Sequence, residues 1–293
     1  HNPGVRFSVL TTNWSHTSLS KLEALRERLK IRVDVVEIAG EALSRLPVLR
    51  AHLTASAYAR LFIPDLLPDE ERVIYMDCDM LVTGSLDEAW TCDLNDKVVA
   101  AVRCPAPTAA FAAAINLPIE QYFNSGFLVL NLRLWREESI AATCLNALTS
   151  PGCPYLSEDE SALNDVARGR VRYLDAGFNL YALDQVWQSP LLAPSSIRVI
   201  HYVTRPKPWT GPCPFAELWL AEVASLPELS GFQPTPEAWR ARLTRWNRSR
   251  KALMGSMVGK ARYSGHRKAH RFIHNVLIPT YLATGHFPEL SGF

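Results

Sequence analysis

The sequence predicts an α/β protein in which a mostly parallel sheet is flanked by helices and followed by a basic C-terminal extension. Over the first two thirds of the chain, short β-rich runs alternate with helical patterns, as in parallel sheets whose strands are joined by helices. Several runs are apolar on both faces, which is typical of strands covered on each side. Eleven of the 31 Lys and Arg residues lie between Glu237 and Glu289, a stretch without Asp or Glu. We therefore expect an α/β domain over residues 1–233 and a basic extension over residues 234–293.

Composition limits the class of protein. Hydrophobic residues make up 48% and charged residues 20% of the chain, as in an ordinary globular protein. No apolar run reaches the roughly 18 residues that a membrane-spanning helix needs. The six cysteines have no C-x-x-C spacing, which argues against a zinc framework or a disulfide scaffold and favours reduced thiols. We therefore expect a cytoplasmic protein.

Local patterns place the strands and the first helices. Leucines three or four residues apart predict a helix over Ser18–Lys30, and a second helix is predicted over His52–Phe62, ending near Pro64. The predicted strands are Arg6–Thr12, Arg32–Ile38, Arg72–Met76, Val98–Val102, Phe127–Asn131, Val171–Leu174 and Ile197–Tyr202.

A third helix is predicted from a local capping pattern. Ser157 and Glu160 have the spacing of a capping box, in which each side chain bonds a backbone N–H of the other residue. The helix is therefore expected from Glu158 to Ala167, with Gly169 closing it.

Two carboxylates directly after a buried strand form the most informative local feature. Asp77 and Asp79 follow the apolar run Arg72–Met76. Because side chains alternate along a strand, the two carboxylates point to the same side, about 6.5–7 Å apart at the backbone. In open α/β sheets, ligands bind outside the carboxyl ends of the strands. Two such oxygen donors can hold Mn²⁺ or Mg²⁺, although the same pattern also fits carboxylates that cap a helix or turn.

Further segments follow a recognisable order along the chain. They are Ala57–Leu61, the strand Val73–Asp79 continued by Leu86–Trp90, the block Tyr122–Leu132, the segment Asp159–Asn164, and the segment His201–Trp209. In this order they resemble the Y-x-R-L helix, the D-x-D strand, the F-N-[AS]-G block, the D-Q-D-x-L-N helix and the closing H-Y-x(4)-K-P-W segment of the family 8 glycosyltransferases. These are retaining enzymes with the GT-A fold, a Rossmann-like sheet flanked by helices, and they include bacterial lipopolysaccharide galactosyl- and glucosyltransferases and glycogenin. The similarity covers about residues 5 to 210.

The resemblance implies a metal site and a diphosphate contact. Asp77 and Asp79 would bind the metal, which bridges the two phosphates of UDP, and His201 would be the third protein ligand. Lys207 would contact the diphosphate and stabilise the leaving group. Taken alone, His201 would instead be a structural histidine and Lys207 a solvated loop residue.

The resemblance also implies residues around the donor sugar. Arg60 would reach the sugar or a phosphate, Asn124 would hold sugar hydroxyls, and Gly126 would allow close backbone approach. Asp159 would bind the donor sugar. At Glu160 the family commonly has Gln, near the reacting carbon; a carboxylate there can act as a nucleophile, stabilise an oxocarbenium-like transition state, or only cap the helix.

Three departures from the family pattern are expected to matter. His1–Val9 already resembles the family's second strand, so the first βα unit, which holds the uracil, has no counterpart. Thr204 stands where the family often has Gly, three residues after His201. Cys104 stands where some relatives have an acidic residue for the sugar, which leaves the donor open.

The basic extension mixes Lys and Arg with apolar anchors. Its apolar members include Trp239, Trp246, Met254, Met257 and Phe272. This mixture is typical of a segment that lies on an anionic membrane surface. A nucleic-acid partner has no supporting motif and is not expected, and a solvated helical extension without a partner is the plainer alternative.

Together these features predict a metal-dependent hexosyltransferase. It would move galactose or glucose from a UDP-sugar to a hydroxyl of a cell-surface glycan or glycolipid, at the inner face of the membrane. The alternative is a catalytically inactive UDP-sugar- or glycan-binding protein of the same fold. A phosphotransferase of the D-x-D type is disfavoured, because its motif is expected near the start of the chain with a later acidic motif.

Overall fold

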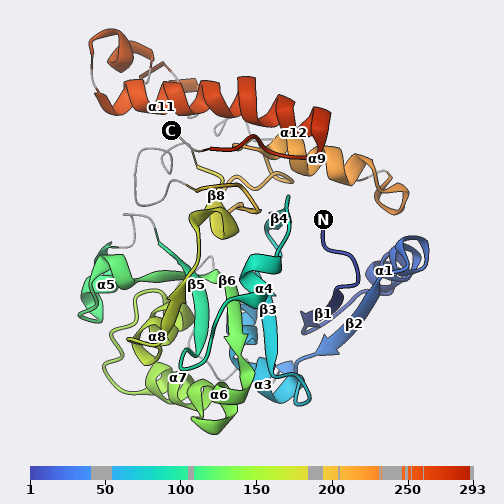
Figure 1. Ribbon diagram of the computed structural model, residues 1–293, viewed down its shortest axis with the longest axis vertical. Helices are drawn as coiled ribbons and strands as arrows, with labels where there is room; N and C mark the ends of the chain where they lie inside the picture. Colours follow the sequence, from blue (N-terminus) through green and yellow to red (C-terminus); the bar gives the residue numbers. More distant parts are fainter. Residues whose placement is uncertain are drawn as a thin grey trace. The chain divides into compact units, whose positions relative to one another are not determined.

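The computed structural model divides the chain into two units, shown in Figure 1. Unit 1 comprises His1–Asp77 and Leu86–Leu174, and unit 2 comprises Cys78–Ser85 and Asp175–Phe293. The structure describes residues 1–40, 55–104, 109–183, 194–203, 205–230, 232, 246–247, 250–251, 253–259 and 261–290.

A four-stranded sheet carries the core of unit 1. Its strands are β3 (Arg72–Met76), β6 (Phe123–Asn131), β5 (Val99–Arg103) and β7 (Val171–Tyr173), in that order. The predicted α/β class is confirmed, but the sheet is mixed rather than mostly parallel, because β6 runs antiparallel to both β3 and β5. The alternation of strands and helices predicts the layers of a fold; it does not encode the direction of each strand.

Pairing with β6 positions the end of β3. Met76 pairs with Phe127, and the backbone N–H of Asp77 donates to the carbonyl of Gly126 over 2.8 Å. On the other side of β6, the register shifts between Ala101 and Val102. Such bulges redirect side chains locally, here beside Asn124, which pairs with Val102.

Helices cover this sheet. α6 (Leu132–Glu137), α7 (Ile140–Thr149) and α8 (Glu158–Val166) contact one another or β6 (Figure 1). The core that they enclose contains Tyr58, Phe123 and Trp135, all buried. Among the described residues of unit 1, the other short helices are η1 (Ala55–Phe62), α3 (Ile63–Leu66), α4 (Asp87–Thr91), α5 (Ala109–Ala114) and η3 (Ile119–Gln121).

The helix predicted over His52–Phe62 ends at Phe62, as expected, and a second short helix follows it directly. Residues 52–54 lie outside the described part of the chain, η1 is a 3₁₀ helix, and α3 begins at Ile63 with Pro64 in its first turn. Proline is tolerated there, because the first backbone N–H groups of a helix have no acceptor within it.

A smaller parallel pair begins the chain. β1 (Arg6–Thr11) and β2 (Arg32–Glu37) flank α1 (His16–Leu29), in agreement with the predicted positions. The leucine stripe of α1 is not buried: Leu19 and Leu29 are exposed.

Unit 2 has a three-stranded sheet and a helical layer. The strand order is β4 (Met80–Val82), β9 (Val199–His201), β8 (Leu180–Tyr181), and the turn η4 (Ala176–Asn179) leads into β8. The helices that the structure delimits in this unit include α9 (Ala216–Ala224), η7 (Pro227–Leu229), α11 (Ala261–Phe272), the π-helix η8 (Ile273–Leu277) and α12 (Ile278–Thr284) (Figure 1).

The C-terminal helices contribute to the core of unit 2. Ile273, Leu277 and Tyr281 belong to the same buried cluster as Leu180 and Phe215. Within the described residues, no helix combines the length and apolarity needed to cross a membrane.

Candidate active site

The carboxylate of Asp77 is held from two sides within unit 1. The Tyr75 hydroxyl donates to Asp77 Oδ1 over 2.7 Å, and Arg60 Nη2 lies 3.1 Å from the same oxygen. The guanidinium of Arg60 also lies over the ring of Tyr75, 4.6 Å from its centre. The first carboxylate of the D-x-D motif is therefore oriented by residues of η1 and β3.

Arg60 is a buried cation that bonds to protein groups. It donates to the carbonyls of Ala57 and Ser125 and forms an ion pair with Asp159 at 3.0 Å. Burial lowers the pKa of Arg60, but the negative groups around it raise the pKa by more, so the guanidinium stays charged. The resemblance implies that Arg60 reaches the donor sugar or a phosphate; in the structure, Arg60 lies between Asp77 and Asp159.

Asp159 is buried beside the guanidinium of Arg60, a cation that it shares with Asp77. Burial raises its pKa; the charge of Arg60 opposes this shift, Glu160 and Asp77 add to it, and the pKa of Asp159 reaches about 7. Arg60 Nε carries a single hydrogen, which it donates to Ala57, so Asp159 Oδ2 receives no hydrogen bond although the ion pair is close.

Glu160 points toward β6 instead of capping its helix. Its Oε2 accepts from Asn124 Nδ2 at 2.7 Å and from the backbone N–H of Ser125 at 3.1 Å. Its Oε1 accepts from the hydroxyls of Tyr122 and Ser157, at 3.2 and 3.3 Å. Burial raises the pKa of Glu160, while Ser125, Arg60 and Asn124 work against that shift.

The predicted capping box is therefore wrong. The backbone N–H of Ser157 donates to the Ser161 hydroxyl at 3.1 Å, and the Ser157 side chain makes no capping bond. The helix itself forms where it was predicted, but tertiary bonds to β6 outcompete the local pattern for the carboxylate of Glu160. Asn124 links this carboxylate to Gly126, because its Oδ1 accepts from the Gly126 N–H at 3.0 Å.

The second carboxylate, Asp79, belongs to unit 2 and bonds to two side chains there. Its Oδ1 lies 3.1 Å from His201 Nε2, and its Oδ2 accepts from Lys207 Nζ. Burial raises the pKa of Asp79, but hydrogen bonds and charges from His201 and Lys207 lower it to about 2. Strand pairing explains the encounter: Met80 of β4 pairs with His201 of β9, and Tyr202 N–H donates to the Asp79 carbonyl at 2.9 Å.

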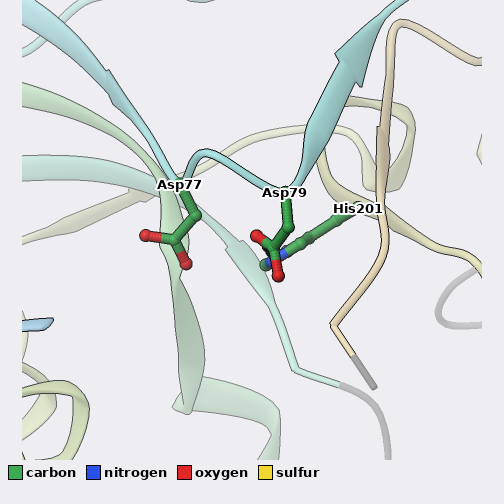
Figure 2. Close-up of side chains that lie close together, drawn as sticks. All are labelled: Asp77, Asp79 and His201. Carbon is green, nitrogen blue, oxygen red and sulfur yellow. Dashed lines mark hydrogen bonds and ion pairs between the residues drawn. The ribbon is translucent and has the colours of Figure 1, made fainter. Parts of the chain in front are cut away.

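The two carboxylates and the imidazole form a candidate metal site. Only Cys78 separates Asp77 from Asp79, and the two side chains point to the same side of this segment (Figure 2). Asp77, Asp79 and His201 each offer one ligand atom, and these atoms lie within 4.8 Å of one another. Two carboxylate oxygens and one ring nitrogen are suitable donors for a divalent cation such as Mn²⁺.

The structure thus brings the predicted site residues into two clusters joined at Cys78. One contains Arg60, Asp77, Asn124, Gly126, Asp159 and Glu160, and the other contains Asp79, His201 and Lys207. Cys104 is buried, and Thr204 lies outside the described residues.

Three contacts of this site were not predicted from the sequence. Tyr75 bonds Asp77, Tyr122 bonds Glu160, and Asn179 bonds His201. Tyr75 could have been found, since it lies two residues before Asp77 on the same side of the strand. For Asn179 the sequence offers no local signal, because its partner lies 22 residues away.

The profile of the family described as "Glycosyl transferase family 8" matches residues 1–213 of the chain. The chain belongs to this family. Family 8 membership and the motif geometry agree, because the matched region contains every residue of both clusters.

The proteins similar to this family 8 chain include bacterial glycosyltransferases. A putative glycosyltransferase of Haemophilus influenzae is 24% identical, with 80% of this chain and 73% of that protein covered. The lipopolysaccharide 1,3-galactosyltransferase of Salmonella typhimurium is 26% identical, with 75% and 69% covered. Several streptococcal relatives are longer, and the chain spans 26 to 29% of their length.

Solved structures support the fold of this family 8 protein. The crystal structure of an active-site mutant of LgtC superposes with a TM-score of 0.69 and 25% sequence identity, covering 82% of this chain and 90% of LgtC. The GT-A fold expected from the sequence is thereby confirmed.

Proposed function

We propose that this protein is a metal-dependent, retaining hexosyltransferase that uses a UDP-sugar donor. The observation that carries the proposal is the meeting of Asp77, Asp79 and His201 at the end of β3 in a family 8 chain. Family membership supports the reaction class, and the three side chains would hold a divalent cation that binds the donor diphosphate.

Residues of the chain are proposed to have separate roles around that cation. Asp77, Asp79 and His201 would hold Mn²⁺ or Mg²⁺, which neutralises charge on the departing UDP when bound. Lys207 brings a compact positive charge to Asp79, so it is placed to interact with a phosphate oxygen once the donor arrives. Arg60 keeps Asp77 oriented and balances the charge of Asp159.

We propose that Glu160 orients the donor sugar and stabilises the transition state, and that it does not act as a nucleophile. Four hydrogen-bond donors reach the two oxygens of Glu160, and these bonds occupy lone pairs that a nucleophile would use to attack the sugar carbon. A carboxylate fixed in this way can instead stabilise positive charge on the sugar ring in the transition state. Asn124 would hold a sugar hydroxyl, and Asp159 the donor sugar.

The acceptor is proposed to be a hydroxyl of a cell-surface glycan or glycolipid, and the donor UDP-galactose or UDP-glucose. The Salmonella relative is named a lipopolysaccharide galactosyltransferase, which supports this class of acceptor.

We further propose that the C-terminal extension, residues 234–293, associates with an anionic membrane surface. Its described part exposes Trp246, Met254, Met257 and Val258, and Arg250 stacks on the ring of Trp246 at 4.6 Å. Exposed apolar side chains among cationic ones are what an interfacial segment presents to anionic lipids.

The direct test is UDP release from UDP-galactose and UDP-glucose, measured with Mn²⁺ and with a chelator. The proposal expects turnover that needs the metal and that is lost in Asp79→Asn. An exposed-site variant, Asp69→Asn, serves as the matched control and should keep full turnover. If UDP binds but neither sugar nucleotide is turned over, the chain is a nucleotide-sugar-binding protein and the proposed activity is refuted.

A further inference from the structure

A buried amide lies behind the ring of His201. The Oδ1 atom of Asn179 is 2.8 Å from His201 Nδ1, and the two residues are only 4% and 3% exposed. The ring of Tyr181 meets the imidazole edge to face at 5.7 Å, which restricts its rotation. Both ring nitrogens therefore have a partner, because Nδ1 faces Asn179 and Nε2 faces Asp79, while the ring of Tyr181 packs against the imidazole.

The turn that carries Asn179 is fixed by its own contacts. Asp175 Oδ1 accepts from the Gly177 N–H at 2.8 Å, and the Arg198 N–H donates to the Gly177 carbonyl at 2.9 Å. A Cβ atom at Gly177 would lie 1.6 Å from the carbonyl oxygen of Ser196, so only glycine fits there. Such close backbone approach leaves η4 little freedom, and the amide of Asn179 is held in one position.

This arrangement determines which ring nitrogen carries the proton. A neutral imidazole has one donor nitrogen and one acceptor nitrogen. When the ring is neutral, the amide oxygen of Asn179 makes Nδ1 the donor and leaves the Nε2 lone pair directed at Asp79 Oδ1; only the protonated ring can also donate from Nε2 to Asp79. Two electron-rich atoms 3.1 Å apart are suited to binding a cation between them.

We propose that Asn179 is a positioning residue that fixes the tautomer and orientation of His201, so that Nε2 can bind a divalent cation together with Asp77 and Asp79. The inference rests on the proposed metal site and adds a residue to it. Histidine ligands of metals generally donate their other ring N–H to a fixed acceptor, and loss of such an acceptor weakens metal binding about 10–100-fold.

The experiment measures Mn²⁺ binding to the chain at saturating UDP, by electron paramagnetic resonance of the free ion. Asn179→Leu removes the acceptor at similar volume and should weaken Mn²⁺ binding about 10–100-fold. Asn179→Asp retains an oxygen facing Nδ1 and should keep the affinity close to that of the parent. If Asn179→Leu does not fold, Asn179→Ala removes the amide without added bulk.

A second readout separates positioning from a structural effect. In the metal-free parent with a neutral ring, nitrogen-15 NMR of His201 should show the proton on Nδ1, whereas Asn179→Leu should shift population to the Nε2-protonated form. Phe178→Leu serves as the control, because it reduces packing in the same short helix while the amide of Asn179 is retained. It should lower the unfolding temperature and leave the tautomer unchanged.

The outcomes separate a failure of this inference from a failure of the proposed function on which it rests. A parent chain that binds no Mn²⁺ with UDP would refute the metal site itself. Parent-like affinity and an unchanged Nδ1-protonated ring in Asn179→Leu would overturn only the role of Asn179.

Discussion

Arg60 Nε lies 3.0 Å from Asp159 Oδ2, yet its single hydrogen goes to the carbonyl of Ala57. The pair is therefore held by charge more than by a directed hydrogen bond. Asp77 shares the same guanidinium through Nη2 at 3.1 Å. One buried cation thus balances two carboxylates, and this relationship makes both the stability and the pH response of unit 1 predictable.

Removing the shared cation should be costly. Arg60→Met leaves Asp77 and Asp159 without their counter-charge, and breaking a buried pair in this way costs about 3–5 kcal/mol of unfolding free energy. Urea unfolding measures this change. Arg133→Met, which removes an exposed i,i+4 pair with Glu137, should cost no more than about 0.5 kcal/mol. Equal losses in the two variants would contradict the central role of Arg60.

Stability should fall with rising pH because of Asp159. Its pKa is about 7 in the folded chain and near the ordinary aspartate value when unfolded. Between these values the folded state keeps a proton that the unfolded state releases, so the contribution is fully present below about pH 4 and is lost as pH rises through 7. Unfolding free energies measured from pH 4.5 to 8 with a chelator test this.

The control for that pH response is Asp159→Asn. This variant cannot titrate, so it should show a flatter profile over the same range, with the difference on the order of a few kcal/mol. Parallel profiles for the parent and the variant would show that another group is responsible.

Loss of the Lys207 side chain should weaken nucleotide binding without weakening metal binding. Its ammonium bonds Asp79 Oδ2 and the carbonyl of Tyr202. Lys207→Ala should weaken UDP affinity about 10–100-fold, because a charged hydrogen bond contributes about 1.5–3 kcal/mol. Mn²⁺ affinity without nucleotide should not fall, since a competitor for Asp79 is removed. Calorimetry of both ligands measures this, with exposed Lys251→Ala as control; a matching fall in Mn²⁺ affinity would contradict it.

The role of Glu160 can be tested by an isosteric change. Glu160→Gln keeps an acceptor for the Asn124 amide and the Ser125 N–H. If Glu160 orients the donor sugar and stabilises the transition state, turnover of the variant should remain within about a hundredfold of the parent. This is the loss expected when a single electrostatic contact to the transition state is weakened. A covalent nucleophile would instead lose nearly all turnover, because an amide does not replace a carboxylate in bond formation. Single-turnover assays with UDP-galactose and UDP-glucose distinguish the two.

The sequence by itself determined the local elements and the position of the metal carboxylates. Strand and helix periodicities are properties of neighbouring residues, which is why β3 was predicted with its observed bounds and α8 to within one residue. The same two-residue period put Asp77 and Asp79 on one side of the chain, as observed. The ordered motifs identified the family before any contact was known.

Only the tertiary structure decided the direction of β6, the orientation of Glu160 and the partners of His201. The capping pattern at Ser157 was locally complete, yet Asn124 and Ser125 on another element bind Glu160 more favourably. His201 meets Asp79 across 122 residues through the pairing of β4 with β9, and Asn179 reaches it from η4. Such contacts depend on which strands pair and in which register, and that choice is made by the whole core rather than by the residues that form the site.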